Sequence, residues 1–240
     1  MQQILTITKR ELGAYFGSLM AYMLLILFLG FSGFFTWIYG NDIFFIKQAT
    51  MMPFFSIAYW TLFFLIPALT MRLFSEENRM GTLKLLLTKP ISDLQIIVGK
   101  YLATLILIAI ALALTLPYVI TLANIGNLDF GQVASGYLAL LLFSSMYISL
   151  GLLTSSLTKN QIVSVLLSLF IGVFFQLIFG MLADGSSGFF GSLLNYLNVN
   201  SHFDSMIRGL IDSRDLIYFL GFTFVGLLLT EIMILRKRIA

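Results

Sequence analysis

The sequence predicts an all-α membrane protein, a single domain over residues 1–240 with six transmembrane helices. The first reason is composition: 59% of the residues are hydrophobic and only 10% are charged, whereas soluble domains carry about 25% charged residues. The second is that six separate apolar runs each approach the ~20 residues that a helix needs to cross a bilayer. A third is the uneven placement of the basic residues along the chain.

Residues 1–18 have the pattern of an amphipathic helix that lies along the membrane surface. The charged side chains Lys9, Arg10 and Glu11 are grouped away from its apolar side chains. The first span is expected to follow over about 19–39, and it ends in aromatic residues of the kind that gather at membrane interfaces.

The second span covers about 53–71, and Pro67 within it is expected to bend the helix. The segment that follows, 74–101, is the longest charged run in the chain. Its apolar stretches are too short and too charged to cross a bilayer. We therefore expect a surface helix here, joined rigidly to the spans on both sides.

Local signals divide this charged segment into two short helices. Ser75 is in position to cap the first turn. Gly81 interrupts the helix, and Thr82 is expected to cap a second helix that Pro90 stops.

The third and fourth spans are predicted over about 93–123 and 133–157. Ser92 followed by Gln95 matches a capping box and marks the start of the third span, and Pro117 predicts a kink in it. Small residues line the fourth span and predict close packing against other helices: Ser144, Ser145, Ser149, Gly151 and Ser155.

The fifth span is predicted over about 162–183. Residues 184–215 are too polar to cross the membrane and too apolar for a free loop, so we expect short helices packed at its outer surface. The sixth span covers about 216–235, and three basic residues, 236–238, close it.

The basic residues predict the orientation, because cytosolic segments are enriched in lysine and arginine. With both termini in the cytosol, the cytosolic segments hold eleven basic residues and the outer loops hold three, Lys47, Arg208 and Arg214. We therefore expect a multi-pass protein of the bacterial inner membrane with both termini cytosolic.

Several kinds of chemistry are not expected. The chain has no G-x-x-x-x-G-K-[ST] phosphate loop, so we expect no ATP-binding site and no enzymatic activity in the chain itself. One histidine gives too few ligands for a metal site, and we interpret His202 as a surface polar residue. Gln176, deep in the fifth span, is expected to make an interhelical hydrogen bond.

The residues alone leave the role of the charged segment open. Its leucines could dip into lipid while its lysines meet anionic headgroups, or it could dock in a groove of a soluble partner. Two other classes are a structural membrane anchor or assembly protein and an ion-coupled carrier. The carrier is disfavoured because ionisable groups are nearly absent from the span interiors.

The run LFSEENRMGTLKLLLTKPISDLQIIVGKYLA, residues 73–103, resembles the signature segment of ABC-2 type transporter permeases, EE-x-x-x-GT-x-E-x-LL-x-x-P-[IV]-S followed by GK. The six-span pattern and the late outer helices are similar too, so the resemblance covers essentially the whole chain. Within the family, the chain is most similar to permeases of gliding-motility and copper-processing systems. It departs from the motif at Lys84, where the family usually has an acidic residue.

The resemblance implies a type V exporter-like fold that serves export or force transmission. Two permease chains, alike or different, would pair, and two copies of a separate ATPase subunit would bind ATP and Mg, with no cofactor in this chain. Membrane lipid and an outer-side partner are also implied, and nucleic acid is not. Residues 1–18 would be the connecting helix. The coupling helix that meets the ATPase would contain Glu76, Glu77, Arg79, Gly81, Thr82, Leu85, Leu86 and Pro90. The dimer seam or cavity would include Phe64, Pro67, Ser168 and Gln176.

Overall fold

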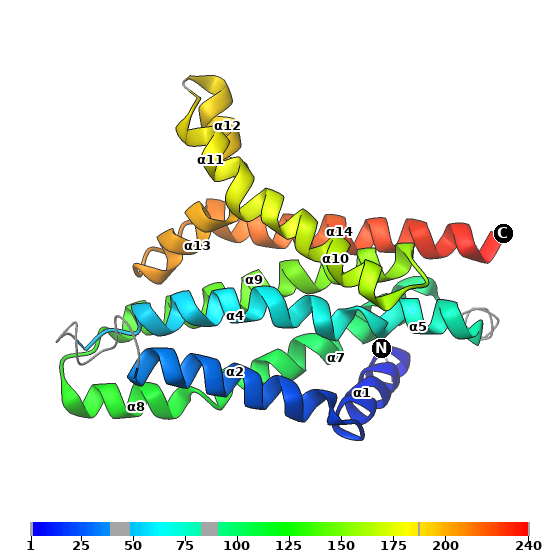
Figure 1. Cartoon of the computed structure of the whole chain (residues 1–240), viewed down its shortest axis with the longest axis horizontal. Helices are drawn as coiled ribbons and strands as arrows, with labels where there is room; N and C mark the ends of the chain where they lie inside the picture. Colours follow the sequence, from blue (N-terminus) through cyan, green and yellow to red (C-terminus); the bar gives the residue numbers. More distant parts are fainter. Residues whose placement is uncertain (1, 39–48, 83–90, 187, 240) are drawn as a thin grey trace.

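The computed structural model describes residues 2–38, 49–82, 91–186 and 188–239, and none of these residues forms a strand. The chain is an all-α polytopic membrane protein with six described helices long and apolar enough to span a membrane (Figure 1). The helices are α1 (Gln2–Phe16), α2 (Leu19–Trp37), α4 (Met52–Thr70), α5 (Arg72–Met80), α7 (Asp93–Ala113), α8 (Leu116–Ile125), α9 (Phe130–Leu157), α10 (Gln161–Val173), η1 (Phe174–Ile178), α11 (Phe179–Asp184), α12 (Phe189–Leu197), α13 (Val199–Ile207) and α14 (Ser213–Ile239).

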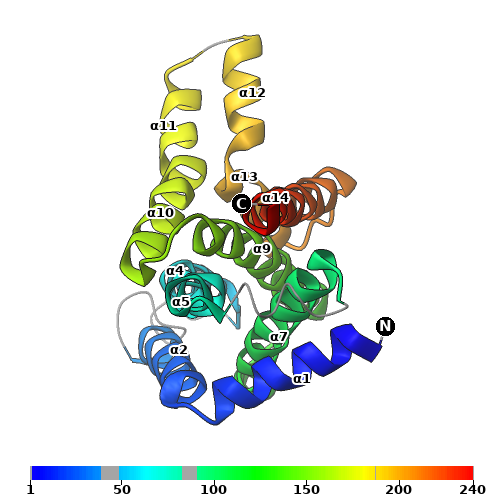
Figure 2. The same ribbon diagram turned by 90° about the vertical axis from the view of Figure 1, so that its right-hand side faces the viewer.

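Helix α9 is the centre of the bundle and the most deeply buried of the six spans. Viewed along the bundle, α4, α7, α10 and α14 surround it (Figure 2). Glycines make this packing close: a Cβ atom at Gly136 would collide with the ring of Phe55, and one at Gly151 with the side chain of Thr70. The close packing predicted from the small residues of the fourth span is confirmed.

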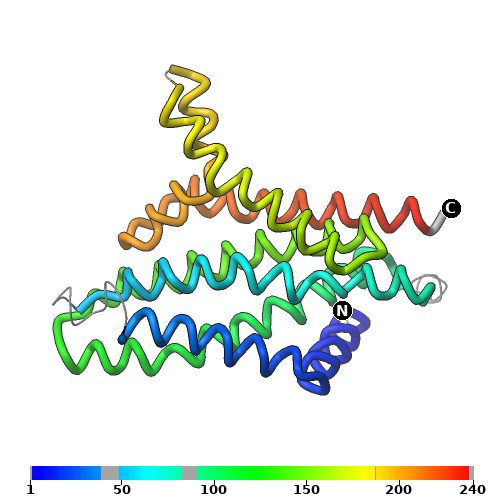
Figure 3. Tube along the Cα trace, viewed as in Figure 1, coloured from blue at the N-terminus to red at the C-terminus, as the bar shows by residue number. Residues whose placement is uncertain are grey.

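The second span continues directly into α5, and the Cα trace bends only slightly between them (Figure 3). Met71 separates the two helices, four residues after Pro67, and its N–H still bonds to the Pro67 carbonyl at 2.9 Å. The prediction that Ser75 caps a new helix is wrong. Ser75 lies inside α5 and its hydroxyl donates to the Met71 carbonyl, because a helix that continues from α4 has no free N-terminus to cap.

The described end of α5 agrees with its predicted stop signal. Gly81 caps the helix in the left-handed conformation, with φ of 72°, which glycine adopts without steric penalty. Residues 83–90 lie outside the described residues. The second short helix, the departure at Lys84 and the predicted coupling residues Leu85, Leu86 and Pro90 therefore have no structural outcome.

The third span begins and bends as predicted. Ser92 accepts from the Gln95 N–H, and the Gln95 side chain accepts from the Ser92 N–H, which completes the capping box. The span breaks after α7, and α8 restarts with Pro117 in its first turn. Proline is tolerated there because the first N–H groups of a helix have no intrahelical partner.

The fifth span consists of three pieces where one helix was predicted. The π-helical turn η1 joins α10 to α11, and α11 and α12 form a hairpin that projects from the bundle (Figure 1). Helix α13 returns to pack against α9 and α14. The short helices expected between the last two spans are present.

Two predictions about single polar residues are wrong. His202 is buried, not at the surface, because it pairs with Asp215 of α14. Gln176 is buried in η1, and among the described residues its side chain has no hydrogen-bond partner. Its backbone carbonyl instead accepts a bond from Asn200 Nδ2 at 2.8 Å. In a π-helical turn the hydrogen-bond register shifts from i→i+4 to i→i+5. The bond from Asn200 of α13 is made to a backbone carbonyl within this irregular turn.

Candidate functional site: an ion cluster that joins three helices

The first turn of α5 is fixed to the central helix by one serine. Ser155 Oγ of α9 accepts from the N–H groups of Phe74 and Ser75, at 3.0 and 3.1 Å, and donates to the Met71 carbonyl at 2.7 Å. Phe74 is itself fully buried. A movement of α5 at this point would therefore either move α9 or leave buried amides unpaired.

Lys100 of α7 is a charged side chain buried in the bundle, with only 1% of its surface exposed. Its ammonium group donates to the Leu73 carbonyl at 2.8 Å, to Glu77 Oε1 at 2.7 Å and to Glu11 Oε1 at 3.3 Å. The ring of Phe74 lies 5.3 Å from the same nitrogen. A lysine ammonium has three N–H donors, and all three have acceptors here. Since α1, α5 and α7 each contribute to the site, the buried charge connects three helices.

Arg10 completes the cluster at its exposed edge. Its guanidinium lies 2.6 Å from Glu11 Oε1 and 3.9 Å from Glu77 Oε1. Two carboxylates thus face two cations, which is the balance that a buried ionic group requires. Burial by itself would raise the pKa of the Glu11 carboxyl, but the Lys100 and Arg10 charges outweigh it and hold that pKa below its usual value.

Helix α1 lies across α7, and their contact is close enough to fix the position of Glu11 (Figure 2). A Cβ atom at Gly99 would lie 2.6 Å from Ile7 Cγ2, so only glycine allows this approach. Thr8 Oγ1 donates to the Gly99 carbonyl at 3.2 Å, and Tyr15 and Thr104 share a hydrogen bond of 3.0 Å. Helix α1 is therefore a docked part of the bundle and not only a surface helix.

A hollow of about 280 Å³ opens beside the cluster, between α1 and α5. The ionisable side chains that line it are Glu11, Tyr15, Arg72, Glu76, Glu77 and Lys100. Arg72 reaches across it to donate to Ser18 Oγ at 3.2 Å. Both signs of charge are present at this surface, next to the exposed tip of α5.

The structure separates the predicted coupling residues into two groups. Glu77 faces inward to Lys100, whereas Arg79 at the tip is exposed and Glu76 lines the hollow. Thr82 follows Gly81 and donates to the Glu77 carbonyl at 3.4 Å. The sequence interpretation missed Lys100 and Glu11 as partners of Glu77. One signal was present: Lys100 is the only cation of α7, and it lies seven residues after the start of that helix, where the apolar run has begun.

One comparison with known proteins decides the family. A family model described as ABC-2 family transporter protein matches residues 41–235, which contain the second to fifth spans and most of the sixth. The chain belongs to the ABC-2 family of transporters. This permease is thus the membrane subunit of an ABC transporter, a component that is typically non-catalytic and that partners an ABC ATPase subunit. No curated protein matches the chain.

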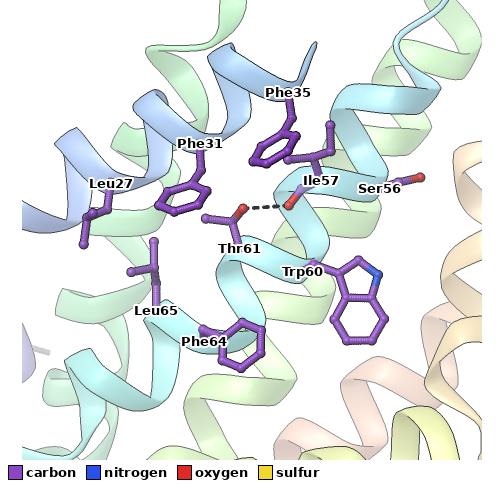
Figure 4. A pocket seen from close by; sticks show the side chains of 9 residues that line it. All are labelled: Leu27, Phe31, Phe35, Ser56, Ile57, Trp60, Thr61, Phe64 and Leu65. Atoms are coloured by element: carbon purple, nitrogen blue, oxygen red, sulfur yellow. Dashed lines mark hydrogen bonds between the residues drawn. The ribbon is translucent and has the colours of Figure 1, made fainter. Parts of the chain in front are cut away.

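The predicted seam residues of this permease lie in different environments. Phe64 is 57% exposed and lines an apolar hollow of about 520 Å³ between α2 and α4 (Figure 4). Its ring and those of Phe31 and Trp60 lie around this hollow (Figure 4). Pro67, Ser168 and Gln176 are buried within the chain, so of the four only Phe64 presents a large exposed side chain.

Proposed function

We propose that the permease couples ATP hydrolysis by a separate ATPase subunit to movement of its spans, and that the ATPase binds at the tip of α5. The observation that carries this proposal is the buried contact of Lys100 with Glu77 and Glu11. Separating a buried ion pair typically costs about 3–5 kcal/mol. A push on α5 is therefore more easily accommodated by moving α1 and α7 together than by breaking the cluster.

The proposal places the α5 end of the bundle in the cytosol, in the inner membrane of a bacterium. The excess of lysine and arginine in the segments at this end supports that orientation. Helix α1 and the last described turns of α14 lie toward the same end of the bundle as α5, as an even number of spans requires (Figure 1).

The assembly we propose contains two permease chains and two copies of the ATPase subunit, which would hold ATP and Mg. The fifth span and the α2–α4 hollow with Phe64 would form the seam between permeases. In support, the fifth span is the least buried of the six. Cycles of ATP binding and release would then export a substrate or transmit force to an outer-side partner. The chain resembles gliding-motility and copper-processing permeases in sequence, so we include both export and force transmission in the proposal.

Charge reversal at the tip of α5 tests the docking of the ATPase. We expect affinity purification of the full chain from native membranes to recover an ATPase subunit. Arg79→Glu should reduce recovery about tenfold, equivalent to ~1.4 kcal/mol of binding free energy. Lys159→Glu is the matched control. It reverses the charge of an exposed residue in the turn between α9 and α10 and should leave recovery of the ATPase unchanged.

Reconstitution distinguishes coupling from the alternative of a structural anchor. Purified ATPase should hydrolyse ATP at a different rate when it is reconstituted with the permease in lipid. An unchanged rate, or purification of the wild-type chain without any ATPase, would contradict the proposal.

A further inference from the structure

Side chains from two other helices, α13 and α14, form hydrogen bonds with the carbonyl groups at the C-terminal end of α12. The last carbonyls of a helix lack the usual intrahelical donor, and here side chains from outside the helix approach three of them. Ser201 Oγ of α13 donates to the Asn195 carbonyl at 2.9 Å, and the Tyr218 hydroxyl of α14 donates to the Leu197 carbonyl at 2.8 Å. His202 Nε2 lies 2.8 Å from the remaining carbonyl, that of Tyr196.

The other ring nitrogen of His202 also faces an acceptor. Its Nδ1 lies 2.6 Å from Asp215 Oδ1 at the start of α14. A neutral imidazole carries one N–H and cannot donate to a carboxylate and a carbonyl at the same time. While Asp215 is ionised, both hydrogen bonds form together only when the ring carries two protons and a positive charge.

The surroundings of His202 would suit a protonated ring. Only 7% of the residue is exposed, and the carboxyl group of Asp215 lies beside it. The ring stacks on Tyr218 with centroids 4.1 Å apart, an arrangement that favours a cation over an aromatic face. The C-terminal end of α12 adds the negative end of a helix dipole.

Asp215 is the one charged group bonded to the ring. Other titratable or charged side chains on the packed elements are Tyr196 of α12, Tyr137 and Tyr147 of α9, and Arg214 and Tyr218 at the near end of α14, with Glu231, Arg236 and Lys237 at its far end and none in η1. Helix α13 itself carries Asp204, and Arg208 follows its last residue. Tyr59 of α4 also reaches α13, where its hydroxyl donates to Asn200 Oδ1 at 2.6 Å.

We propose that His202 and Asp215 form a proton-dependent strap that holds α12 against α13 and α14. When the ring loses its second proton, the remaining proton stays on Nδ1, against the stronger acceptor Asp215, and the bond from Nε2 to the Tyr196 carbonyl of α12 breaks. The end of α12 then keeps only its bonds from Ser201 and Tyr218. The α11–α12 hairpin, which projects from the bundle at the end away from α5, gains freedom as a result (Figures 1 and 2). This control by pH does not depend on the ATPase coupling proposed above, and either can fail without the other.

The protonation state of the ring can be observed directly, because His202 is the only histidine in the chain. We would record ¹⁵N spectra of the full chain, labelled at histidine, in lipid nanodiscs. The closed strap requires imidazolium shifts at both ring nitrogens, and the open strap requires one nitrogen without a proton. A ring that is neutral at every pH, or one that carries two protons at every pH, would overturn the strap.

Spin labels measure whether the strap acts on α12. The chain contains no cysteine, so Leu193→Cys on α12 and Ile217→Cys on α14, both at exposed positions, give one labelled pair. The distance distribution should be narrow near about pH 6 and broad near about pH 9. An unchanged distribution would contradict the proposal.

Asp215→Asn is the discriminating variant. Its amide can donate to Nδ1 of a neutral ring while Nε2–H keeps its bond to Tyr196, so both bonds survive without a cation. The distribution should then stay narrow at both pH values, whereas His202→Phe, which keeps the stacking but has no N–H, should broaden it at both. Broadening of the Asp215→Asn variant with pH, as in the wild type, would overturn the proposal.

Discussion

Lys100 Nζ lies 2.7 Å from Glu77 Oε1, inside the helix bundle, although the two residues belong to different spans. This contact places the only described lysine with almost no exposed surface at the junction of α5 and α7. Because Glu11 shares the same ammonium, helix α1 takes part as well. The end of the permease that we propose as its ATPase contact is thus held together by charge as well as by apolar packing.

Lys100→Met should strongly destabilise the protein. It leaves the carboxylates of Glu77 and Glu11 without their buried counterion, and breaking such a pair costs about 3–5 kcal/mol. Thermal unfolding in detergent would measure the effect, with exposed Lys159→Met as a control of little consequence. The double variant Lys100→Met, Glu77→Gln should recover part of the loss. A single variant as stable as the control would contradict the role of the cluster.

Acidification should weaken the same cluster through Glu11. The pKa of its carboxyl is lowered in the folded protein, so its stabilising effect is complete above the ordinary value of 4.5 and is lost as the pH falls through the lowered value. At pH values below the lowered pKa, the melting temperature should therefore decrease. The decrease should be less steep in Glu11→Gln. Glu76→Gln, at a residue for which the structure describes no ion pair, is the control and should retain the wild-type slope.

Ser155→Ala should loosen α5 locally. It removes the acceptor of two buried amides, those of Phe74 and Ser75, at an expected cost of about 1–3 kcal/mol. Hydrogen exchange measured by mass spectrometry should be faster in α5 and unchanged in α14. Ser156→Ala removes a hydroxyl that bonds to Leu153 within the same helix, so α5 should keep its wild-type protection in that variant.

Gly151→Ala should be poorly tolerated, because the added methyl group would collide with Thr70 across the α4–α9 contact. Overpacking of this kind costs about 1–3 kcal/mol. The matched substitution Gly13→Ala meets no atom within 4 Å and should be neutral or stabilising by up to ~1 kcal/mol. The yield and melting temperature of the two purified variants would decide, and equal behaviour would argue against close packing at α9.

The sequence predicted features that depend on neighbouring residues. Ser92 and Gln95 form the expected cap, Gly81 ends α5, and Pro117 accompanies the break between α7 and α8. Each of these signals acts within one turn of its own helix. The prediction for Ser75 failed because a capping residue is recognised only from its own neighbours. Whether the preceding helix α4 ends before Ser75 depends on residues outside that local pattern, and here the helix continues into α5.

The partners of buried charged residues could not be predicted from neighbouring residues, because these partners lie on other helices. Asp204 is the acidic residue nearest to His202 in sequence, but the partner of His202 is Asp215 on another helix. Lys100 lies 89 residues from Glu11 in the chain, and the two meet only because α1 crosses α7 at Gly99.

The sequence by itself determined how many times the chain crosses the membrane and where most crossings begin and end. Hydropathy and length are sufficient for this, since a bilayer requires about 20 apolar residues in each helix. Only the tertiary structure decided that α9 is the centre of the bundle and which buried charges meet. Those outcomes depend on close contacts between helices that are distant in sequence. The sequence of one helix does not specify which other helices it contacts.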